Sequence, residues 1–277
     1  MRTIRLKSGQ SLPSLGMGTW RMGENSKDFD DEVLALRHGL GLGFSLIDTA
    51  EMYGEGGAEE VVSEAIKGRR QSVFLVSKVY PHNASRDGAI AACNRTLKRL
   101  NTDYLNLYLL HWRGSYPLSE TLEAFQQLKQ AGKIRDYGVS NFDTDDMEEA
   151  MQVPGGDAIA TNQVLYNLSR RGIERNLLPW CTQRQMPVMA YSPVEQGRIL
   201  NNATLKQLAK ERDASAAQIA NAWLLHQPNL VINPKSSRID HIEQNYAAQH
   251  LALSPQELET LEVAFPAPKK SIPLQML

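Results

Sequence analysis

Four polar residues lie where they could together transfer a proton to a carbonyl oxygen. Asp48, Lys78 and His111 each end or directly follow a short apolar segment, and Tyr53 lies five residues after Asp48. A free tyrosine has a pKa of about 10, which is too high for efficient proton donation near neutral pH. A nearby ammonium stabilises the phenolate and lowers that pKa. We therefore expect Lys78, kept charged by Asp48, to make Tyr53 a general acid, while a neutral His111 orients the substrate oxygen.

Each of these residues also has an ordinary structural explanation when it is considered by itself. Asp48 could cap a turn, and Tyr53 could pack in the core. Lys78 could extend to solvent, and His111 could be a hydrogen-bonded histidine at the rim of the fold. Their combination favours catalysis, in which a positioned general acid contributes roughly 10²–10⁴ in rate. Reduction of a carbonyl also needs a hydride, so a nicotinamide-binding site is expected elsewhere.

The clearest candidate for part of that site is a basic segment near the C-terminus, where Lys235, Ser236, Ser237 and Arg238 follow one another. Cations are unfavourable at a helix N-terminus, because the helix dipole is positive there. Lys235 and Arg238 are better explained by an anion that lies between them, held also by backbone N–H groups and serine hydroxyls. A solvated basic loop is the alternative.

Two other motifs lead to no site. The segment Gly16-Met17-Gly18-Thr19-Trp20-Arg21 begins like a dinucleotide fingerprint, but Arg21 replaces the third glycine and no helix is evident behind it. The six histidines show neither H-x-x-x-H nor H-E-x-x-H spacing. We therefore expect no metal.

Composition restricts the class of protein. The 277 residues are 42% hydrophobic and 22% charged, as in soluble globular proteins. A net charge of -1 argues against a nucleic-acid partner. Cys93 and Cys181 alone make neither a disulfide framework nor a cysteine-based zinc site. No segment resembles a membrane span or a signal peptide. We expect a soluble cytoplasmic monomer that binds a small-molecule substrate and has no membrane or nucleic-acid partner.

Eight short apolar segments alternate with segments of helical periodicity. The strand-like segments are residues 15–18, 45–47, 73–76, 104–110, 137–139, 161–165, 188–190 and 230–232. Strands separated by helices predict a parallel sheet that is covered on both faces. Eight such units in under 280 residues favour a closed (β/α)8 TIM barrel, with a doubly wound open sheet as the alternative. We expect one domain over residues 1–277.

The ends of this barrel have different expected roles. Residues 4–12 alternate apolar and polar side chains around Ser8-Gly9, which predicts a β-hairpin that closes the bottom. Active sites of such barrels lie at the C-terminal ends of the strands, where Asp48, Lys78 and His111 are placed. Phosphate sites often follow the last strands, which favours the anion site at Lys235.

The sequence resembles the aldo-keto reductases over essentially its whole length. The motifs that carry the resemblance are Gly16-Met17-Gly18-Thr19-Trp20, Asp48-Thr49-Ala50, Tyr53-Gly54, Lys78, His111, Gly138-Val139-Ser140-Asn141-Phe142, Asn162-Gln163, Ala190-Tyr191-Ser192-Pro193 and Pro234-Lys235-Ser236. One of these motifs alone is weak, but the ordered set is specific. The resemblance implies that Asp48, Tyr53, Lys78 and His111 are a catalytic tetrad, with Tyr53 as general acid.

The same resemblance implies NADPH as the cofactor. The residues implied to bind it are Thr19, Trp20, Ser140, Asn141, Gln163, Tyr191, Ser192, Lys235, Ser236, Ser237, Arg238, His241 and Asn245. Ser140, Asn141 and Gln163 are implied to bind the nicotinamide carboxamide. Tyr191 is implied to stack on the nicotinamide ring, and Ser192 is implied to lie at the pyrophosphate. Lys235 and Ser236 correspond to ligands of the adenosine 2′-phosphate, and Asn245 to the adenine-side asparagine.

Two features concern specificity. Many relatives have a second arginine where this sequence has His241, and an imidazole is a weaker phosphate partner than a guanidinium. We therefore expect a preference for NADPH that is less strict than in those relatives. The implied substrate wall consists of Trp20, Tyr53, Tyr80, His111 and Trp112. The loop after His111 and the C-terminal tail are short, which predicts an open pocket for small aldehydes and dicarbonyls such as methylglyoxal.

Three functions are compatible with these residues. The favoured one is an NADPH-dependent carbonyl reductase similar to bacterial methylglyoxal and diketogluconate reductases. A second is a barrel lyase in which Lys78 forms a Schiff base with its substrate. A third is a binding module that uses a nicotinamide site as a redox sensor and needs no general acid.

Overall fold

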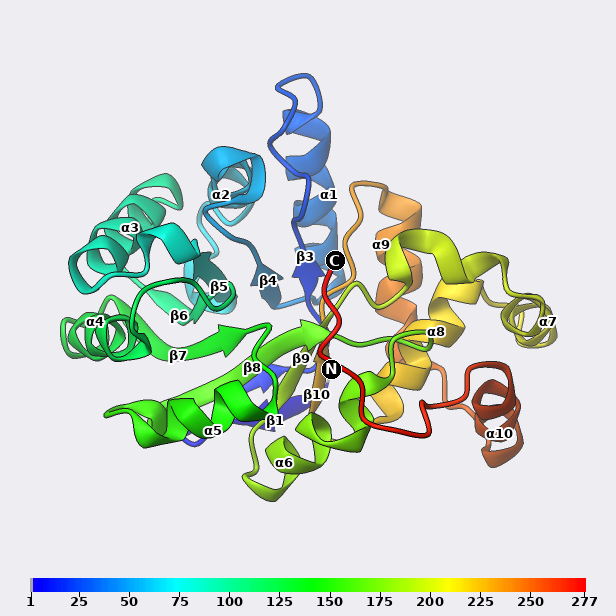
Figure 1. Ribbon diagram of the computed structural model, residues 1–277. Helices are drawn as coiled ribbons and strands as arrows, with labels where there is room; N and C mark the ends of the chain where they lie inside the picture. The colour runs from blue at the N-terminus through cyan, green and yellow to red at the C-terminus, as the bar shows by residue number, and fades with distance from the viewer. Residues whose placement is uncertain (1) are drawn as a thin grey trace.

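The computed structural model describes residues 2–277, which form an eight-stranded parallel barrel surrounded by helices (Figure 1). The barrel strands are β3 (Met17–Gly18), β4 (Leu46–Asp48), β5 (Phe74–Val79), β6 (Leu105–Leu110), β7 (Ile134–Ser140), β8 (Ile159–Leu165), β9 (Val188–Tyr191) and β10 (Leu230–Ile232). Neighbours pair in chain order, and the bridges Leu15–Ile232 and Gly18–Lys235 join β10 to β3. The predicted TIM barrel is confirmed, and the open sheet is wrong.

A helix follows each barrel strand and covers the outside of the sheet (Figure 1). These helices are α1 (Phe29–Leu42), α2 (Gly57–Ala65), α3 (Arg86–Arg99), α4 (Leu118–Gln130), α5 (Thr144–Gln152), α6 (Leu177–Gln183), α8 (Ala216–His226) and α9 (Ile239–Ala247). Two more are additions to the repeat: α7 (Ala203–Glu211) precedes α8, and α10 (Pro255–Ala264) follows α9.

Local side-chain chemistry defines where several helices begin. Ser85, Asp143, Asn202, Ser215 and Ser254 each accept a hydrogen bond from a backbone N–H of the first turn that follows them. Such caps satisfy N–H groups that have no partner inside the helix. The helices α1, α2, α4 and α9 begin without a side-chain cap, and α9 is the one that follows the predicted anion site.

Alternation along the strands divides the core into two apolar layers. Side chains such as Leu46, Val76, Leu107 and Met189 point inward and fill the barrel, while a larger cluster packs between the sheet and the helices. Both faces of the sheet are therefore apolar, as expected for a covered parallel sheet. Because the interior is filled, a ligand has to bind at an end of the barrel.

The hairpin closes the N-terminal end, as predicted. Its strands are β1 (Thr3–Arg5) and β2 (Ser11–Pro13), which pair antiparallel. Leu6 and Leu12 join the apolar layer inside the barrel. Gln10 Nε2 donates to the Asn106 carbonyl at 3.2 Å, near the start of β6. A ligand therefore has to bind at the opposite end, where the strands terminate.

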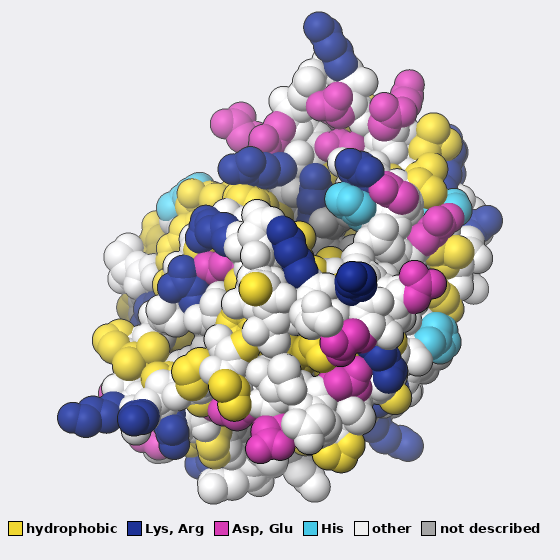
Figure 2. Space-filling view, turned by 90° about the vertical axis from the view of Figure 1, so that its right-hand side faces the viewer, with side chains coloured by type: hydrophobic (Ala, Val, Ile, Leu, Met, Phe, Trp, Pro, Cys, Tyr) yellow, Lys and Arg dark blue, Asp and Glu magenta, His cyan; other side chains and the backbone are white. Residues whose placement is uncertain are grey.

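The outer surface carries mixed charge. Figure 2 shows acidic and basic side chains interspersed over the side of the molecule where α7 and α10 lie. Cys93 and Cys181 are both buried free cysteines. Over residues 2–277, no helix is both long enough and apolar enough to cross a bilayer.

A buried ion pair supports the strand that carries Lys78. Glu59 of α2 is fully buried and accepts hydrogen bonds from Ser77 Oγ of β5 and from Arg99 Nε of α3, both at 2.6 Å. Burial raises the pKa of the Glu59 carboxyl, against the opposing effects of Arg99 and Ser77. The pair therefore ties two helices to β5 directly beside Lys78.

Replacing Arg99 by methionine tests this support. Arg99→Met leaves the Glu59 carboxylate buried without its charge partner, so we expect the free energy of unfolding to fall by about 3 kcal/mol at neutral pH. Arg37→Met is the matched control, because Arg37 pairs with Glu64 on the surface, where an ion pair contributes about 0–1 kcal/mol. Urea unfolding followed by circular dichroism measures both. Equal losses would contradict the prediction.

Candidate active site

The four predicted catalytic residues meet at one rim of the barrel. Asp48 is the last residue of β4, Lys78 lies near the end of β5, and His111 directly follows β6. Tyr53 begins η1 (Tyr53–Gly56), a short 3₁₀ segment in the loop after β4. The strands are parallel, so their C-terminal ends lie at the same end of the barrel.

Lys78 is the centre of this cluster. Its ammonium donates hydrogen bonds to Asp48 Oδ2 at 2.8 Å, to the Thr49 carbonyl at 2.9 Å and to the Tyr53 hydroxyl at 3.4 Å. The side chain of Lys78 is 0% exposed and that of Asp48 is 6% exposed. Lys78 therefore lies between a carboxylate and a phenol, the arrangement expected from the sequence.

Burial changes the predicted proton affinity of Tyr53. Burial disfavours a charged Lys78, but the Asp48 carboxylate and Tyr53 oppose this effect and leave the pKa of Lys78 raised. Burial also raises the pKa of Tyr53, and the Lys78 ammonium lowers it by a smaller amount. The effect of Lys78 therefore has the predicted direction, but burial outweighs it. Tyr53 holds its proton and Lys78 holds its charge at neutral pH.

His111 is a neutral imidazole. Burial and the nearby charge of Lys78 both lower its pKa well below the usual range. Its ring meets the Tyr53 ring edge-on, with the centroids 5.6 Å apart. Its Nδ1 atom is buried and makes no hydrogen bond within residues 2–277. A neutral ring beside the phenol can donate or accept a hydrogen bond without adding a second positive charge.

The residues predicted to bind the carboxamide lie beside the cluster. Ser140 Oγ and the Asn141 backbone N–H both donate to the Gln163 carbonyl at 2.8 Å. The Tyr191 hydroxyl donates to Asn141 Oδ1 at 3.0 Å. Gln163 Nε2 donates to Asp48 Oδ1 at 3.0 Å. The ends of β7, β8 and β9 therefore form one polar surface that touches Asp48.

The predicted anion site has one paired and one unpaired cation. Arg238 pairs with Asp240 at 2.6 Å, and His241 Nε2 lies 4.0 Å from the same carboxylate. Within residues 2–277, no carboxylate lies at ion-pair distance from Lys235, whose pKa is lowered by partial burial. Lys235 rather than Arg238 is therefore the cation available to an anion.

The other residues expected to bind the cofactor differ in their surroundings. The Thr19 hydroxyl donates to the Asp48 carbonyl, and the guanidinium of Arg21 lies 4.4 Å above the half-exposed Trp20 ring. Ser192 lies in a loop with a φ of 52°. Ser237 is exposed next to the anion site.

Asn245 already has an internal partner. Its Oδ1 atom accepts a hydrogen bond from Asn221 Nδ2 at 3.0 Å. Asn245 therefore links α9 to α8, and its amide nitrogen is the group left to bind an adenine.

Most of the predicted substrate wall is continuous. The Trp112 ring lies 4.9 Å from the His111 ring and 5.0 Å from the Tyr80 ring. Together with the Tyr53–His111 contact, these distances place four rings in a row. Trp20 is outside this row of ring contacts.

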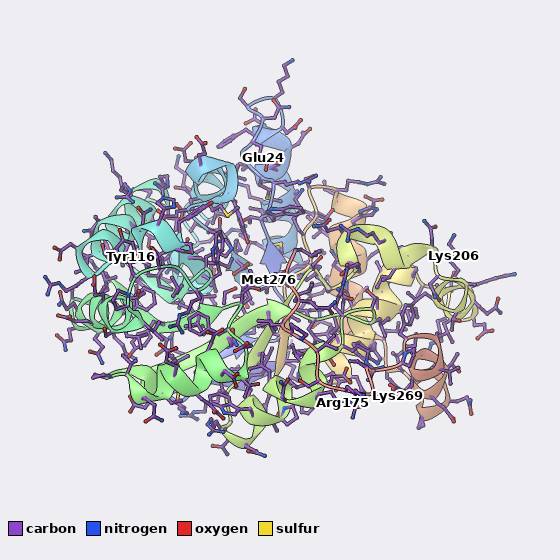
Figure 3. The ribbon with its side chains drawn as sticks, viewed as in Figure 1. Glu24, Tyr116, Arg175, Lys206, Lys269 and Met276 are labelled. Atoms are coloured by element: carbon purple, nitrogen blue, oxygen red, sulfur yellow. The ribbon has the colours of Figure 1, made fainter. Side chains whose placement is uncertain are left out.

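The C-terminal tail contradicts the predicted open pocket. It is short, but Arg175 Nε binds the Pro268 carbonyl at 2.6 Å and directs the tail across the end of the barrel (Figure 1). The Leu277 N–H donates to the Tyr191 hydroxyl at 3.4 Å, and Figure 3 shows Met276 over the centre of the barrel. The short loop after His111 and the short tail together suggested an open mouth. The contacts of the tail with the loop after β8 are what decide its path.

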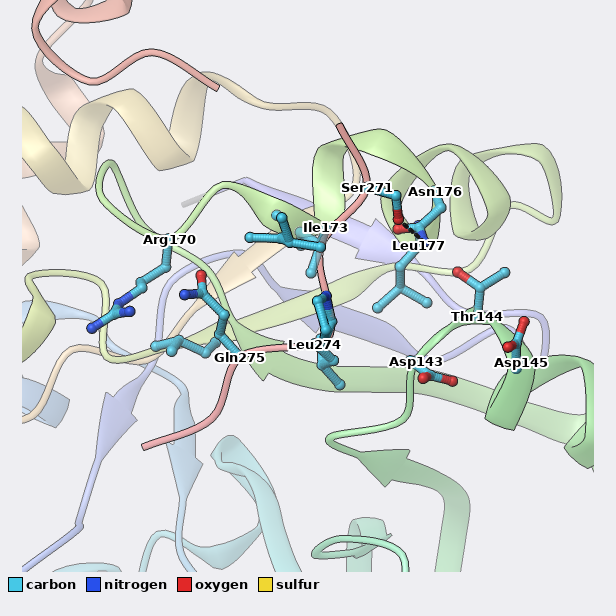
Figure 4. Close-up of a pocket in the computed structure, with 14 residues that line it drawn as sticks. Asp143, Thr144, Asp145, Arg170, Ile173, Asn176, Leu177, Ser271, Leu274 and Gln275 are labelled. Atoms are coloured by element: carbon cyan, nitrogen blue, oxygen red, sulfur yellow. Dashed lines mark hydrogen bonds between the residues drawn. The ribbon is translucent and has the colours of Figure 1, made fainter. Parts of the chain in front are cut away.

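A cavity of about 320 Å³ lies under this tail (Figure 4). Its walls include Asp143 at the start of α5, Arg170 and Ile173 in the loop after β8, and Leu274 and Gln275 of the tail. None of the four catalytic candidates lines it. The cavity therefore lies beside the Lys78 cluster and does not enclose it.

The sequence analysis missed a second buried carboxylate near the site. Glu195 follows Ser192 in the loop after β9 and accepts hydrogen bonds from Arg170 Nε and Asn167 Nδ2, both at 2.8 Å. Asn167 Nδ2 also donates to the Ser192 carbonyl at 2.9 Å. This network holds the loop in its left-handed conformation. The sequence shows two acidic residues, Glu174 and Glu195, and several arginines in these two loops, but it does not indicate which of them pair.

Comparison with known proteins agrees with this geometry. The chain is 52% identical over 281 residues to the methylglyoxal reductase YeaE of Escherichia coli, covering 100% of this chain and 99% of that enzyme. It is 32% identical over 263 residues to a glyoxal reductase of Bacillus subtilis, covering 94% and 91%. An aldo-keto reductase from Klebsiella pneumoniae, solved in complex with NADPH, has 47% identity and a TM-score of 0.97 over 100% of this chain and 99% of that one.

A family model described as the Aldo/keto reductase family matches residues 14–264. That range contains the barrel and all four residues around the Lys78 ammonium. On fold, site geometry and sequence together, the chain belongs to the aldo/keto reductase family of oxidoreductases.

Proposed function

We propose that this protein is an NADPH-dependent reductase that converts small aldehydes and dicarbonyls, such as methylglyoxal, to alcohols. The observation that carries the proposal is the buried Lys78 ammonium, which binds both the Asp48 carboxylate and the Tyr53 hydroxyl. The names of the similar Escherichia coli and Bacillus subtilis enzymes support methylglyoxal and glyoxal as the substrate class.

The donor and acceptor groups of the site fit a nicotinamide dinucleotide phosphate. Gln163 Oε1 accepts no hydrogen bond within residues 2–277 and retains access to solvent, so it can accept from a carboxamide. Lys235 lies before the uncapped N-terminus of α9, where phosphates bind readily. The similar Klebsiella pneumoniae structure with NADPH supports this choice. When bound, NADPH supplies the hydride.

Residues of the chain itself then hold and transfer the proton. Tyr53 carries it on its phenolic oxygen and donates it to the carbonyl oxygen of the substrate. Donation leaves a phenolate, which burial disfavours, and the Lys78 ammonium stabilises it. Asp48 keeps Lys78 charged. The neutral His111 hydrogen-bonds the same substrate oxygen, and the rings of Trp112 and Tyr80 exclude water beside it.

The Schiff-base alternative fits this site poorly. A lysine must be deprotonated to attack a carbonyl carbon. The Asp48 carboxylate and Tyr53 raise the pKa of Lys78, so the amine is protonated at neutral pH. A redox sensor without catalysis would have no use for the contact between Lys78 and Tyr53.

Removing the Tyr53 hydroxyl tests the proposed general acid. We expect Tyr53→Phe to lower kcat for methylglyoxal reduction by about 10²–10⁴, with NADPH affinity unchanged. Tyr104→Phe is the matched control, because Tyr104 lies before β6 at the opposite end of the barrel and stacks on Arg70. The decay of NADPH absorbance measures both. Undiminished turnover in Tyr53→Phe would exclude this role, and a wild type that binds NADPH without consuming it would favour the sensor.

The protonation of His111 is directly measurable. Because burial and Lys78 lower its pKa, the imidazole should still be neutral when the pH falls to the ordinary histidine pKa of about 6.5. Ring-nitrogen NMR shifts report this, with His111→Gln to assign the signal. Lys78→Met should move the titration toward higher pH, because it removes the repelling charge. A wild-type midpoint in the ordinary histidine range would contradict the prediction.

From the geometry of the anion site we expect Lys235, more than Arg238, to determine the preference for NADPH over NADH. Lys235→Met should lower the ratio of kcat/KM for NADPH over NADH by about tenfold, the loss of one charge-assisted hydrogen bond. Arg238→Met should lower it less, because Arg238 already pairs with Asp240. Lys206→Met on α7 is the surface control. Equal efficiency of the wild-type enzyme with NADH and NADPH would overturn the assigned preference.

A further inference from the structure

We propose that Gln163 is a positioning residue that holds the Asp48–Lys78–Tyr53 chain in the arrangement needed for proton donation. This inference rests on the proposed function and adds to it, because it assigns Gln163 a task besides contact with the cofactor.

Gln163 reaches Asp48 across the whole barrel. Gln163 lies on β8 and Asp48 on β4, and three strands separate these two on either side of the closed barrel. The amide nevertheless lies 3.0 Å from the carboxylate, and both residues are at least nine-tenths buried. A hydrogen bond between residues 115 positions apart joins opposite walls of the active site.

The two oxygens of Asp48 have separate donors. Oδ2 accepts from Lys78, and Oδ1 accepts from Gln163 Nε2. A buried carboxylate without hydrogen bonds costs free energy, so loss of the Gln163 donor would favour rotation of Asp48 toward Lys78. The Lys78–Tyr53 contact, at 3.4 Å, is the longest of the three that Lys78 makes. It is therefore the first contact to be lost when Lys78 is drawn toward Asp48.

The same bond determines which end of the Gln163 amide is available. A carboxylate only accepts hydrogen bonds, so Asp48 requires the Nε2 end. Oε1 is thereby directed away from Asp48 and retains access to solvent. Gln163 thus presents an acceptor to the cofactor and requires a donor there, such as the N–H of a carboxamide. One side chain links the cofactor surface to the general acid.

The test is the pH dependence of Gln163→Met, which keeps the length of the side chain but removes the donor. Without the donor, the charge of Asp48 acts more strongly on Tyr53 and Lys78 moves away, and both changes raise the pKa of Tyr53. Reduction requires protonated Tyr53, so the alkaline limb of kcat should move up by about half a pH unit or more. At neutral pH, kcat should fall by about tenfold, because the acid is weaker.

A second measurement needs no turnover. The ultraviolet absorbance of tyrosinate is followed as the pH rises, in cofactor-free wild type and in Tyr53→Phe. The difference between the two curves is the titration of the Tyr53 phenol. The same difference recorded in the Gln163→Met background should show this phenol titrating at higher pH. Gln163→Glu is the conservative variant, because its protonated carboxyl can still donate to Asp48. It should keep near-wild-type activity at acidic pH and lose it as the added carboxyl ionises.

Ser140→Ala separates this role from simple cofactor contact, because Ser140 belongs to the same polar surface but does not bind Asp48. It should weaken NADPH binding without moving the alkaline limb. The proposal is overturned if Gln163→Met weakens NADPH binding but changes neither the alkaline limb of the kcat profile nor the titration of Tyr53. If Gln163→Met does not fold, the proposal is overturned equally by a Gln163→Glu variant whose pH profile of kcat matches that of the wild type. Failure of the proposed function is distinguishable, because Tyr53→Phe would then retain turnover.

Discussion

The site depends on one ammonium that is buried and yet remains charged. Lys78 has three N–H donors, and Asp48, the Thr49 carbonyl and Tyr53 supply three acceptors. A buried charge without such partners would be too costly to retain. The same charge lowers the pKa of His111 and offsets part of the effect of burial on Tyr53. A single buried cation therefore acts on the pKa values of both neighbours, although burial has the larger effect on each.

The closed barrel makes this arrangement possible because it brings opposite strands within side-chain reach. Asp48 is bound by Lys78 from the next strand and by Gln163 from the far wall. The hairpin and the apolar interior close the other end, which leaves the C-terminal mouth of the barrel for a ligand. Behind β5, the Glu59–Arg99 pair ties the strand of Lys78 to two helices. Asp48 and Lys78, two of the candidate catalytic residues, are therefore carried by strands, which suits a site that needs defined distances.

The loops at the mouth of the barrel supply charged side chains that position other segments and are available to a ligand. The loop after β8 binds Glu195 through Arg170 and the tail through Arg175, so one segment positions two others. The loop after β10 supplies Lys235, which lacks a carboxylate partner among the described residues, while Arg238 is neutralised by Asp240. Loops of this kind determine which molecules enter a barrel whose central chemistry is carried by its strands.

The local features of this protein can be read from its sequence. The eight strands, the hairpin and the helices follow from the period of apolar residues, and Asp48, Lys78 and His111 were placed at strand ends by their position after those segments. The balance of burial and charge at Tyr53, where burial outweighs Lys78, depends on how the chain folds around the phenol. The tertiary structure also decided the path of the tail and the Gln163–Asp48 bond. These features depend on residues far apart in the chain. Periodicity and motif spacing report only on near neighbours, whereas desolvation and long-range pairing depend on everything that surrounds a group in three dimensions.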